Sequence, residues 1–245
     1  MTKQNIGIIY GGKSAEHSIS LLTAKSIINA IDKEKYNVFP IFISLEGNWA
    51  RGEQITSEIA DQHDLIFSNF DNDISGLLFE DGRKFDIVFP VLHGPNGEDG
   101  TIQGLLEIMD IAYVGNNVLS SAAGMDKVIM KQLFAAYDLP QLPYVHFIEY
   151  TWKNKKEAII NEINENLKYP VFVKPANLGS SVGISRCNDE AELVKGIEEA
   201  LKFDKKIVVE QGAVGAKEIE VAVIGYNEVK TTYPGEIVNI SSTEF

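Results

Sequence analysis

The chain has little cysteine, few basic residues and no long apolar run. One cysteine among 245 residues, Cys187, excludes an intramolecular disulfide and any multi-cysteine metal site, which fits a reducing compartment. No stretch approaches the roughly 18 apolar residues of a membrane span, and the amino end lacks a signal-peptide pattern. The net charge of −13 leaves no basic stripe for nucleic acid or an anionic membrane. We therefore expect a cytoplasmic protein that binds neither.

Composition and patterning indicate a well-cored α/β protein. With 245 residues, 44% of them apolar and 23% charged, the chain is long enough for one large or two ordinary domains. The strand-like runs are Ile6 to Tyr10, Val38 to Ser44 and Phe85 to Leu92, and the helix-like runs are Ser18 to Ile31 and Ile102 to Met109. This alternation predicts an open, mainly parallel sheet in a first domain, residues 1–122. Ligands of such sheets collect beyond the carboxyl ends of the strands.

Two further regions follow the first domain. Residues 123–213 alternate strand and helix patterns around a loop, which predicts a central α+β domain with partly antiparallel pairing. Glu218 to Ile224 alternates charged and apolar residues, so it predicts a half-buried strand that opens a third domain, residues 214–245. That region is too short to close a domain, so we expect its remainder to be absent.

One strand of the central domain delivers a lysine to a loop rich in glycine and serine. The β-forming run Val171 to Val173 ends in Lys174, and the proline that follows favours extended backbone at that lysine. The loop Gly179 to Gly183, with sequence GSSVG, can turn several N–H and O–H donors toward phosphoryl oxygens. The pattern predicts a phosphate site, and an ordinary surface loop is the alternative.

Two loops of the first domain carry polar groups where its strands end. Glu16 follows a pair of glycines at the start of a helix, where it could hold a substrate ammonium or simply complement the helix dipole. His93 opens a loop that has four glycines among twelve residues, and a loop in that place is a candidate site by location. Taken alone, such a histidine is more often a hydrogen-bonded structural residue than a catalyst.

Charged residues of the central region add weaker signals. Asp126 can cap a helix whose one face carries two lysines four residues apart, the second of them Lys131. Glu210 ends an apolar strand, and with Gln211 it could read the edge of an adenine. Glu218 lies on a strand, where it could bind ribose hydroxyls or face solvent.

Taken together and in order, these segments resemble the D-alanine:D-alanine ligases of the ATP-grasp superfamily. The resemblance rests on five motifs: GGKSAEHSIS from Gly11, HGPNGEDGTIQG from His93, MDKVIMK from Met125, VFVKPANLGSSVGIS from Val171 and KEIEVAVIG from Lys217. It implies an ATP-grasp fold with an N-terminal, Rossmann-like parallel-sheet domain, a central α+β domain and a truncated C-terminal domain.

The resemblance also implies the reaction and the roles of individual residues. ATP phosphorylates one D-alanine, and the amine of a second attacks the D-alanyl phosphate, which gives the dipeptide of peptidoglycan. Glu16 is expected to orient the first D-alanine through a hydrogen-bond link with Ser180, and both are the catalytic candidates. Ile19 and His93 are expected to border that amino acid. The residues expected to contact ATP are Lys131, Phe172, Lys174, Gly179, Ser180, Ser181, Val182, Gly183, Glu210, Gln211 and Glu218.

The departure from the family lies at the carboxyl end. Family members continue into a mobile loop, an arginine that stabilises the tetrahedral intermediate, and the ligands for Mg²⁺. None of these has a counterpart here, so we expect no metal ligand in this chain and an inactive chain on its own. The family suggests a homodimer. The alternatives are a D-alanine:D-lactate or D-alanine:D-serine ligase, a different ATP-grasp ligase, and a truncated nucleotide-binding fragment without activity.

Overall fold

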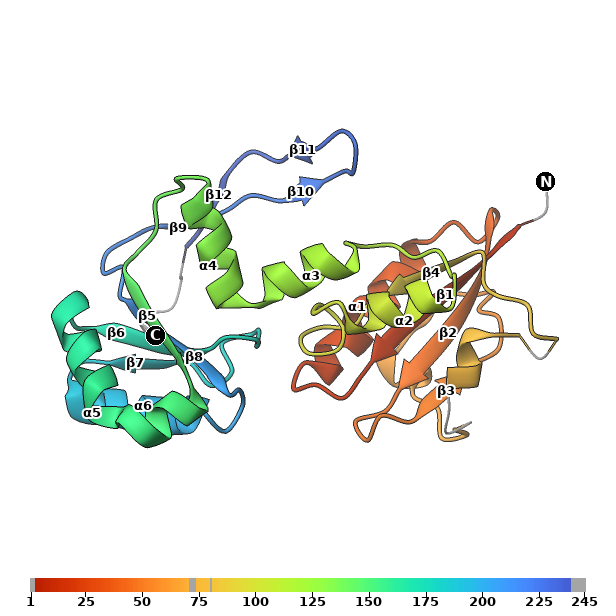
Figure 1. The fold of residues 1–245 in the computed structure, drawn as a ribbon. Helices are drawn as coiled ribbons and strands as arrows, with labels where there is room; N and C mark the ends of the chain where they lie inside the picture. Colours follow the sequence, from red (N-terminus) through yellow and green to blue (C-terminus); the bar gives the residue numbers. More distant parts are fainter. Residues whose placement is uncertain (1–2, 71–73, 80, 239–245) are drawn as a thin grey trace.

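The computed structural model describes residues 3–70, 74–79 and 81–238, arranged as two sheet-based units joined by a pair of helices (Figure 1). The first unit contains β1 (Gln4–Gly11), α1 (His17–Ala30), β2 (Tyr36–Ile43), β3 (Trp49–Arg51), η1 (Gln62–Leu65), η2 (Ile74–Leu77), β4 (Ile87–Pro90) and α2 (Thr101–Ile108). The connecting helices are α3 (Val118–Met125) and α4 (Lys127–Ala136). The second unit contains β5 (Tyr144–Ile148), α5 (Glu149–Asn166), β6 (Val171–Pro175), β7 (Ser185–Cys187), α6 (Glu190–Ala200) and β8 (Lys206–Gln211).

The first sheet has the strand order β3-β2-β1-β4, and β1 pairs in parallel with both of its neighbours. Only β3 runs antiparallel, so the expectation of an open, mainly parallel sheet is confirmed. Helix α1 buries Leu21, Ala24 and Ile28 against one face, at the spacing of a single helical stripe. Residues of α2 and η2 belong to the core on the other face. The carboxyl ends of β1, β2 and β4 therefore meet at one edge.

A capping aspartate separates the two connecting helices. The extended backbone of Asp126, with φ −79° and ψ 105°, ends α3. Its carboxylate then accepts hydrogen bonds from the backbone N–H groups of Val128 and Ile129 at the start of α4. The predicted cap is therefore confirmed. In the part of the chain that the structure describes, no helix is both long and apolar enough to cross a bilayer.

The second sheet has the order β5-β8-β6-β7, and every one of these pairings is antiparallel. Side chains alternate between its faces, so Val171 and Val173 of β6 point into a core with α5 and α6, while Phe172 and Lys174 lie on the opposite face. Helix α6 contributes Leu193, Ile197 and Ala200 to that core, and each fully buried Leu or Ile stabilises the fold by about 1.5–3 kcal/mol. The opposite face is contacted by Val128 of α4.

The carboxyl-terminal ribbon consists of four short strands: β9 (Glu218–Glu220), β10 (Val223–Ile224), β11 (Lys230–Thr231) and β12 (Gly235–Ile237). They form two separate antiparallel pairs, and all their residues are exposed. The prediction of one half-buried strand over Glu218 to Ile224 was therefore wrong. An alternating pattern buries its apolar side only when a second layer covers it, and within the described residues the apolar Ile219 stays 53% exposed. Residues 239–245 of the predicted third domain lie outside the described residues.

Candidate functional site

The carboxylate of Glu16 lies between two loops at the edge of the first sheet. Glu16 immediately precedes α1, and its backbone N–H donates to Ser14 Oγ at 3.1 Å. Gly94, in the loop after β4, has φ +71°, and a side chain there would overlap Glu16 Oε2. The backbone N–H of Gly94 donates to Glu98 Oε2 at 2.8 Å, which holds this loop in place. Glycine is thus required at Gly94 both for its backbone conformation and for the space of the carboxylate.

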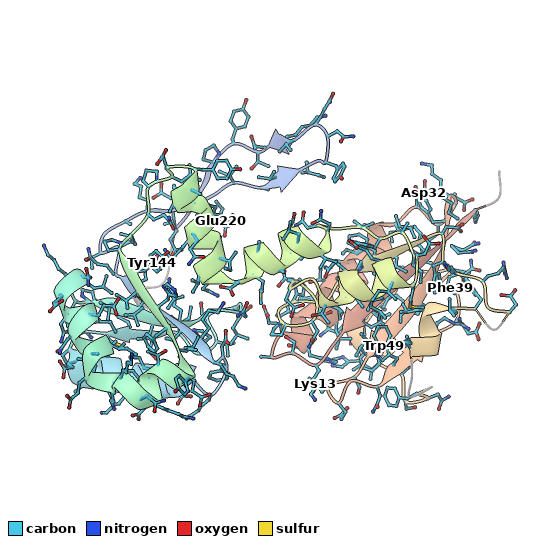
Figure 2. All side chains as sticks on the ribbon, in the orientation of Figure 1. Lys13, Asp32, Phe39, Trp49, Tyr144 and Glu220 are labelled. Carbon is cyan, nitrogen blue, oxygen red and sulfur yellow. The ribbon has the colours of Figure 1, made fainter. Side chains whose placement is uncertain are left out.

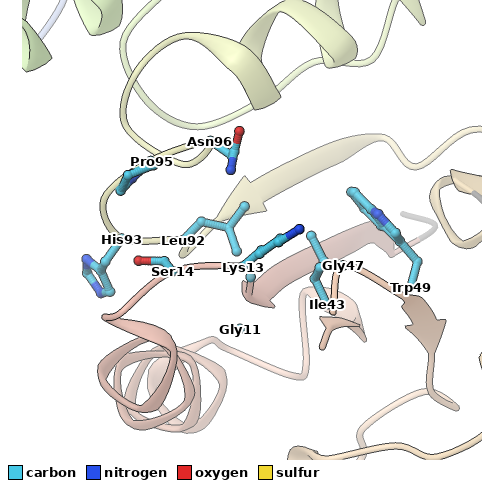
Figure 3. A pocket seen from close by; sticks show the side chains of 11 residues that line it. Gly11, Lys13, Ser14, Ile43, Gly47, Trp49, Leu92, His93, Pro95 and Asn96 are labelled. Atoms are coloured by element: carbon cyan, nitrogen blue, oxygen red, sulfur yellow. The ribbon is translucent and has the colours of Figure 1, made fainter. Parts of the chain in front are cut away.

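A cavity of about 220 Å³ opens at the same edge (Figure 3). Apolar side chains form most of its wall, Lys13 supplies a cation and His93 forms part of the lining. The lining residues are Gly11, Gly12, Lys13, Ser14, Ile43, Gly47, Trp49, Leu92, His93, Pro95 and Asn96. Ile19, predicted to border the same ligand, is 52% exposed on α1 and does not line this cavity.

A carboxylate with two lysines lies on the face of the second sheet that Val128 of α4 contacts. Strand register places Glu210 of β8 between Phe172 of β6 and Tyr144 of β5, the latter labelled in Figure 2. Lys174 Nζ lies 2.7 Å from Glu210 Oε2, and Lys131 of α4 forms an ion pair with Oε1. The ammonium of Lys131 lies 5.0 Å from the centre of the Tyr144 ring, and that of Lys174 lies 5.9 Å from the centre of Phe172.

Burial and charge oppose each other at Glu210. Burial alone raises the pKa of Glu210, but the hydrogen bonds and the positive charges of Lys131 and Lys174 together outweigh it, so the pKa lies below its ordinary value. The side chains are 13% exposed for Glu210, 10% for Lys131 and 25% for Lys174. Two cations share one carboxylate, so the face keeps a positive charge, and Lys174 is the lysine more open to solvent. An anion can be held here by charge and by N–H donors together.

The loop after β6 turns its backbone through left-handed conformations. Ser180 and Ser181 have φ values of +48° and +58°, and each such non-glycine residue stores about 1–3 kcal/mol of strain. Gly183 has φ +71°, and a side chain there would come within 2.8 Å of the Phe203 ring. Strained backbone of this kind persists only where the surrounding structure imposes it. Turns with such conformations form concave sites in which backbone N–H groups can bind an anion.

The base of this loop is tied to the turn after α6. Asp204 Oδ2 accepts the backbone N–H of Asn177 at 2.8 Å and its side-chain amide at 3.0 Å. The other oxygen of Asp204 accepts the backbone N–H of Lys206 at 3.1 Å. One carboxylate thus links the loop to the start of β8, the strand that carries Glu210.

Among the described residues, a side-chain hydrogen bond joins the two units. Ser180 Oγ donates to Glu16 Oε1, across a sequence separation of 164 residues. A Cβ on Gly179 would lie 3.3 Å from Glu16 Oε2, so the loop backbone approaches the carboxylate closely. The structure therefore brings together the acid at the edge of the first sheet and the loop that follows Lys174.

Two predicted site residues lie apart from this cluster. Gln211 follows Glu210 and points to the other face of β8, where its side-chain oxygen accepts the backbone N–H of Lys168 at 3.1 Å. Glu218 is exposed on β9, and its side chain makes no hydrogen bond or ion pair with the described residues. Across residues 3–70, 74–79 and 81–238, no group of three or more His, Cys, Asp or Glu side chains is placed to hold a metal ion.

Comparison with known proteins places this geometry in a family. Residues 5–116 match the family described as D-ala D-ala ligase N-terminus, and residues 133–244 match D-ala D-ala ligase C-terminus. The VanG D-Ala:D-Ser ligase from Enterococcus faecalis is 31% identical, with a TM-score of 0.78, over 96% of this chain and 70% of that one. The chain belongs to the D-Ala-D-Ala ligase family.

Two further structures agree with this assignment. The D-alanine-D-alanine ligase from Coxiella burnetii is 31% identical, with a TM-score of 0.77, over 96% of this chain and 71% of that one. D-alanyl-alanine synthetase A from Vibrio cholerae is 28% identical, with a TM-score of 0.78, over 99% of this chain and 69% of that one. The α/β fold expected for an ATP-grasp ligase is confirmed by these likenesses.

Sequence reasoning missed one cation of this ligase-family site, Lys127. Its ammonium donates to the backbone carbonyl oxygens of Leu178 at 2.5 Å and Ala176 at 3.4 Å, beside the start of the glycine loop. Burial lowers the pKa of Lys127, and the positive charge of Lys174 lowers it further. Lys127 forms no ion pair within the described residues. The motif MDKVIMK contains both Lys127 and Lys131, and the two lysines lie on one face of the helix. The sequence pattern therefore could not show that Lys127 contacts the glycine loop whereas Lys131 pairs with Glu210.

Proposed function

We propose that this chain carries the ATP- and amino-acid-binding groups of a ligase that joins two D-alanines through a D-alanyl phosphate, for peptidoglycan synthesis. The observation that carries the proposal is the Ser180–Glu16 hydrogen bond, because it puts an amine-binding carboxylate beside a phosphate-binding loop. Phosphoryl transfer to an amino acid requires that adjacency, since the carboxylate oxygen and the γ-phosphorus must meet.

At the nucleotide end, the cations and the loop provide the binding groups. Lys174 and Lys131 are proposed to contact the phosphates, with Lys127 as a third cation, and the backbone N–H groups of residues 179–183 cover them. The adenine is proposed to lie against Phe172, with its polar edge at Glu210 and the backbone of Gln211. Glu218 is the proposed ribose contact. Arriving phosphates would compete with Glu210 for its lysines.

At the amino-acid end, Glu16 is proposed to accept hydrogen bonds from the ammonium of the first D-alanine, and Ser180 to fix the orientation of that carboxylate. Ile19 and His93 would border the same substrate. This arrangement directs the substrate carboxylate toward the loop after Lys174. Each hydrogen bond to a charged group is worth about 1.5–3 kcal/mol, so two or three of them suffice to select an α-amino acid.

The chemistry needs positioning and charge stabilisation more than covalent catalysis. A carboxylate oxygen of the first D-alanine attacks the γ-phosphorus, and the bond to the β-phosphate oxygen breaks to give ADP. The lysines and loop N–H groups stabilise the negative charge that develops on the phosphoryl oxygens. The amine of the second D-alanine then attacks the acyl carbon, loses a proton and displaces inorganic phosphate. Mg²⁺ would supply additional positive charge for the nucleotide phosphates in such a ligase, but no group of three or more His, Cys, Asp or Glu side chains among the described residues is placed to hold it.

The rest of the proposal concerns organisation and rests on the family. We propose domains at residues 1–122, 123–213 and 214–245, a homodimer, and a place in the cytoplasm, where ATP is supplied. The two sheets and their helices support the first division, since each sheet has its own apolar core.

One specific comparison supports D-serine as an alternative to the second D-alanine. The D-Ala:D-Ser ligase from Enterococcus faecalis and the D-alanine-D-alanine ligase from Coxiella burnetii are each 31% identical to this chain. Identity therefore does not favour either acceptor. D-serine is the second candidate for the attacking amine, and D-lactate, with a hydroxyl in place of the amine, is the third.

The test measures binding and turnover on the same sample. The purified chain is titrated with a non-hydrolysable ATP analogue, then incubated with ATP, Mg²⁺ and D-alanine, alone or with D-serine or D-lactate, and the products are identified by mass spectrometry. We expect analogue binding that Lys174→Ala weakens. Binding without turnover would agree with the expectation that the chain is inactive on its own, whereas ADP formation that depends on D-alanine would show that the chain is active by itself. Absence of nucleotide binding in the folded chain would overturn the proposal.

A further inference from the structure

The imidazole of His93 contacts Thr23, a residue outside the five sequence motifs. His93 Nε2 lies 3.2 Å from the hydroxyl oxygen of Thr23, in the second turn of α1. The same hydroxyl lies 2.9 Å from the backbone carbonyl oxygen of Ile19, toward which it donates. Thr23 is half-buried, and His93 lies on the wall of the 220 Å³ cavity.

Counting hydrogens links the direction of this contact to the direction in which the Thr23 hydroxyl donates. A threonine hydroxyl has a single hydrogen, and a carbonyl oxygen can only accept. If the hydrogen of Thr23 is directed to Ile19, then the hydroxyl oxygen can only accept from His93, and Nε2 must carry a hydrogen. A neutral imidazole has one N–H, so its Nδ1 is then left as an acceptor. Within the described residues, no hydrogen bond to Nδ1 of His93 is present.

We propose that Thr23 is a positioning residue that holds neutral His93 as the Nε2–H tautomer and leaves Nδ1, which has no partner among the described residues, as a hydrogen-bond acceptor for a ligand. An acceptor of this kind suits an N–H donor, and the ammonium of an α-amino acid is such a donor. That last clause rests on the proposed function, whereas the tautomer itself does not.

The opposite arrangement is chemically possible and gives a different prediction. The hydroxyl could donate to Nε2, since the carbonyl of Ile19 also accepts within the helix. His93 would then carry its hydrogen on Nδ1 and offer a ligand a donor instead of an acceptor. The distances favour the first arrangement, because 2.9 Å is the shorter of the two contacts of the hydroxyl.

Nitrogen NMR distinguishes the two arrangements directly. The chain has four histidines, so two-bond ¹H–¹⁵N correlation spectra of the ¹⁵N-labelled protein are simple, and His93→Gln identifies the signal of interest. Spectra are recorded at a pH where the ring is neutral. We expect a single tautomer with Nε2 protonated in the wild type and in Thr23→Ser, and a mixture of both tautomers in Thr23→Val. Unchanged signals from the other histidines show that the variants fold.

Two results would overturn the proposal: a hydrogen on Nδ1 in the wild type, or a Thr23→Val spectrum identical to that of the wild type. A D-alanine titration then tests the ligand clause. We expect Thr23→Val to raise the half-saturating concentration roughly two- to tenfold and Thr23→Ser to restore it, as for one hydrogen bond. If the chain does not bind D-alanine but shows the expected tautomers, the proposed function is refuted. The role of Thr23 in setting the tautomer of His93 would still stand.

Discussion

The two sheets present their candidate groups in different ways. In the first sheet, Glu16 and His93 lie in loops beyond the ends of parallel strands, where solvent and ligands reach them. In the second sheet, Lys174 and Glu210 lie on the strands themselves, on a face that α4 partly covers. A charge on a covered face needs a counter-ion, whereas a charge in a loop does not. The charged residues of the second sheet should therefore affect both stability and binding, and those of the first sheet binding alone.

The largest effect is expected from Glu210→Gln. This change leaves two partly buried lysines without their carboxylate, and removing one partner of a buried ion pair destabilises a protein by about 3–5 kcal/mol. Urea unfolding at neutral pH measures the loss. The matched control is Glu198→Gln, whose pair with Lys156 is 3.4 Å long and exposed, and which should cost at most about 1 kcal/mol. Equal losses in the two variants would contradict the comparison.

The stability difference between the wild type and Glu210→Gln should depend on pH. The folded pKa of Glu210 lies below its ordinary 4.5, so its stabilising contribution is fully present above that pH. The contribution disappears as the pH falls through the lowered folded value, because the carboxylate then becomes protonated. The stability difference between wild type and Glu210→Gln should therefore narrow in acid below pH 4.5. A difference that stays constant throughout that range would show that the charge of Glu210 is not the cause.

The next effect in size is expected from Lys174→Ala on nucleotide binding. Loss of one hydrogen-bonding cation should weaken the affinity for a non-hydrolysable ATP analogue roughly ten- to hundredfold, measured by calorimetric titration. Stability should fall less than in Glu210→Gln, because Lys131 still pairs with the remaining carboxylate. The control is Lys195→Ala, an exposed lysine of α6. Unchanged affinity in Lys174→Ala would remove that lysine from the nucleotide site.

Local patterns in the sequence were enough to predict the sheet edges, the loop and the cap. The alternating strands and helices predicted the parallel sheet, and the run ending in Lys174 predicted both a strand and the glycine loop after it. Asp126 was predicted as a cap because capping needs only a short side chain before a helix. Each of these features depends on neighbours within a few residues, which is the range that a sequence pattern reports.

The features that the sequence did not predict depend on contacts between segments that are distant in the chain. Glu210 was expected to face an adenine, but its role as the shared partner of Lys131 and Lys174 follows only from the pairing of β8 with β6. The contact of Lys127 with the carbonyl of Leu178 depends on how α4 meets the loop. The exposure of Ile219 depends on what covers the ribbon. No local pattern encodes these tertiary contacts.

A smaller effect, confined to binding, is expected from Glu16→Gln. The amide keeps an oxygen for Ser180 but loses the charge that would attract an ammonium, so the half-saturating concentration of D-alanine should rise about tenfold. The affinity for the ATP analogue and the unfolding midpoint should stay near those of the wild type, because Glu16 has no lysine partner among the described residues. If Glu16→Gln lowers the stability as much as Glu210→Gln does, charged residues in the loops of the first sheet do not differ from those on the covered face of the second sheet.

The smallest effect is expected from Asp189→Ala, which tests whether the two faces of the second sheet are separable. Asp189 accepts the backbone N–H of Glu192 at 2.9 Å and caps α6, the helix that packs on the face opposite Lys174. Removing the cap should cost about 1 kcal/mol in urea unfolding, and Asp189→Asn should restore most of it. Affinity for the ATP analogue should not change, because the cap contacts neither the glycine loop nor Glu210. A parallel loss of affinity would mean that α6 transmits strain to the loop through the turn at Asp204, so that core and site form one cooperative unit.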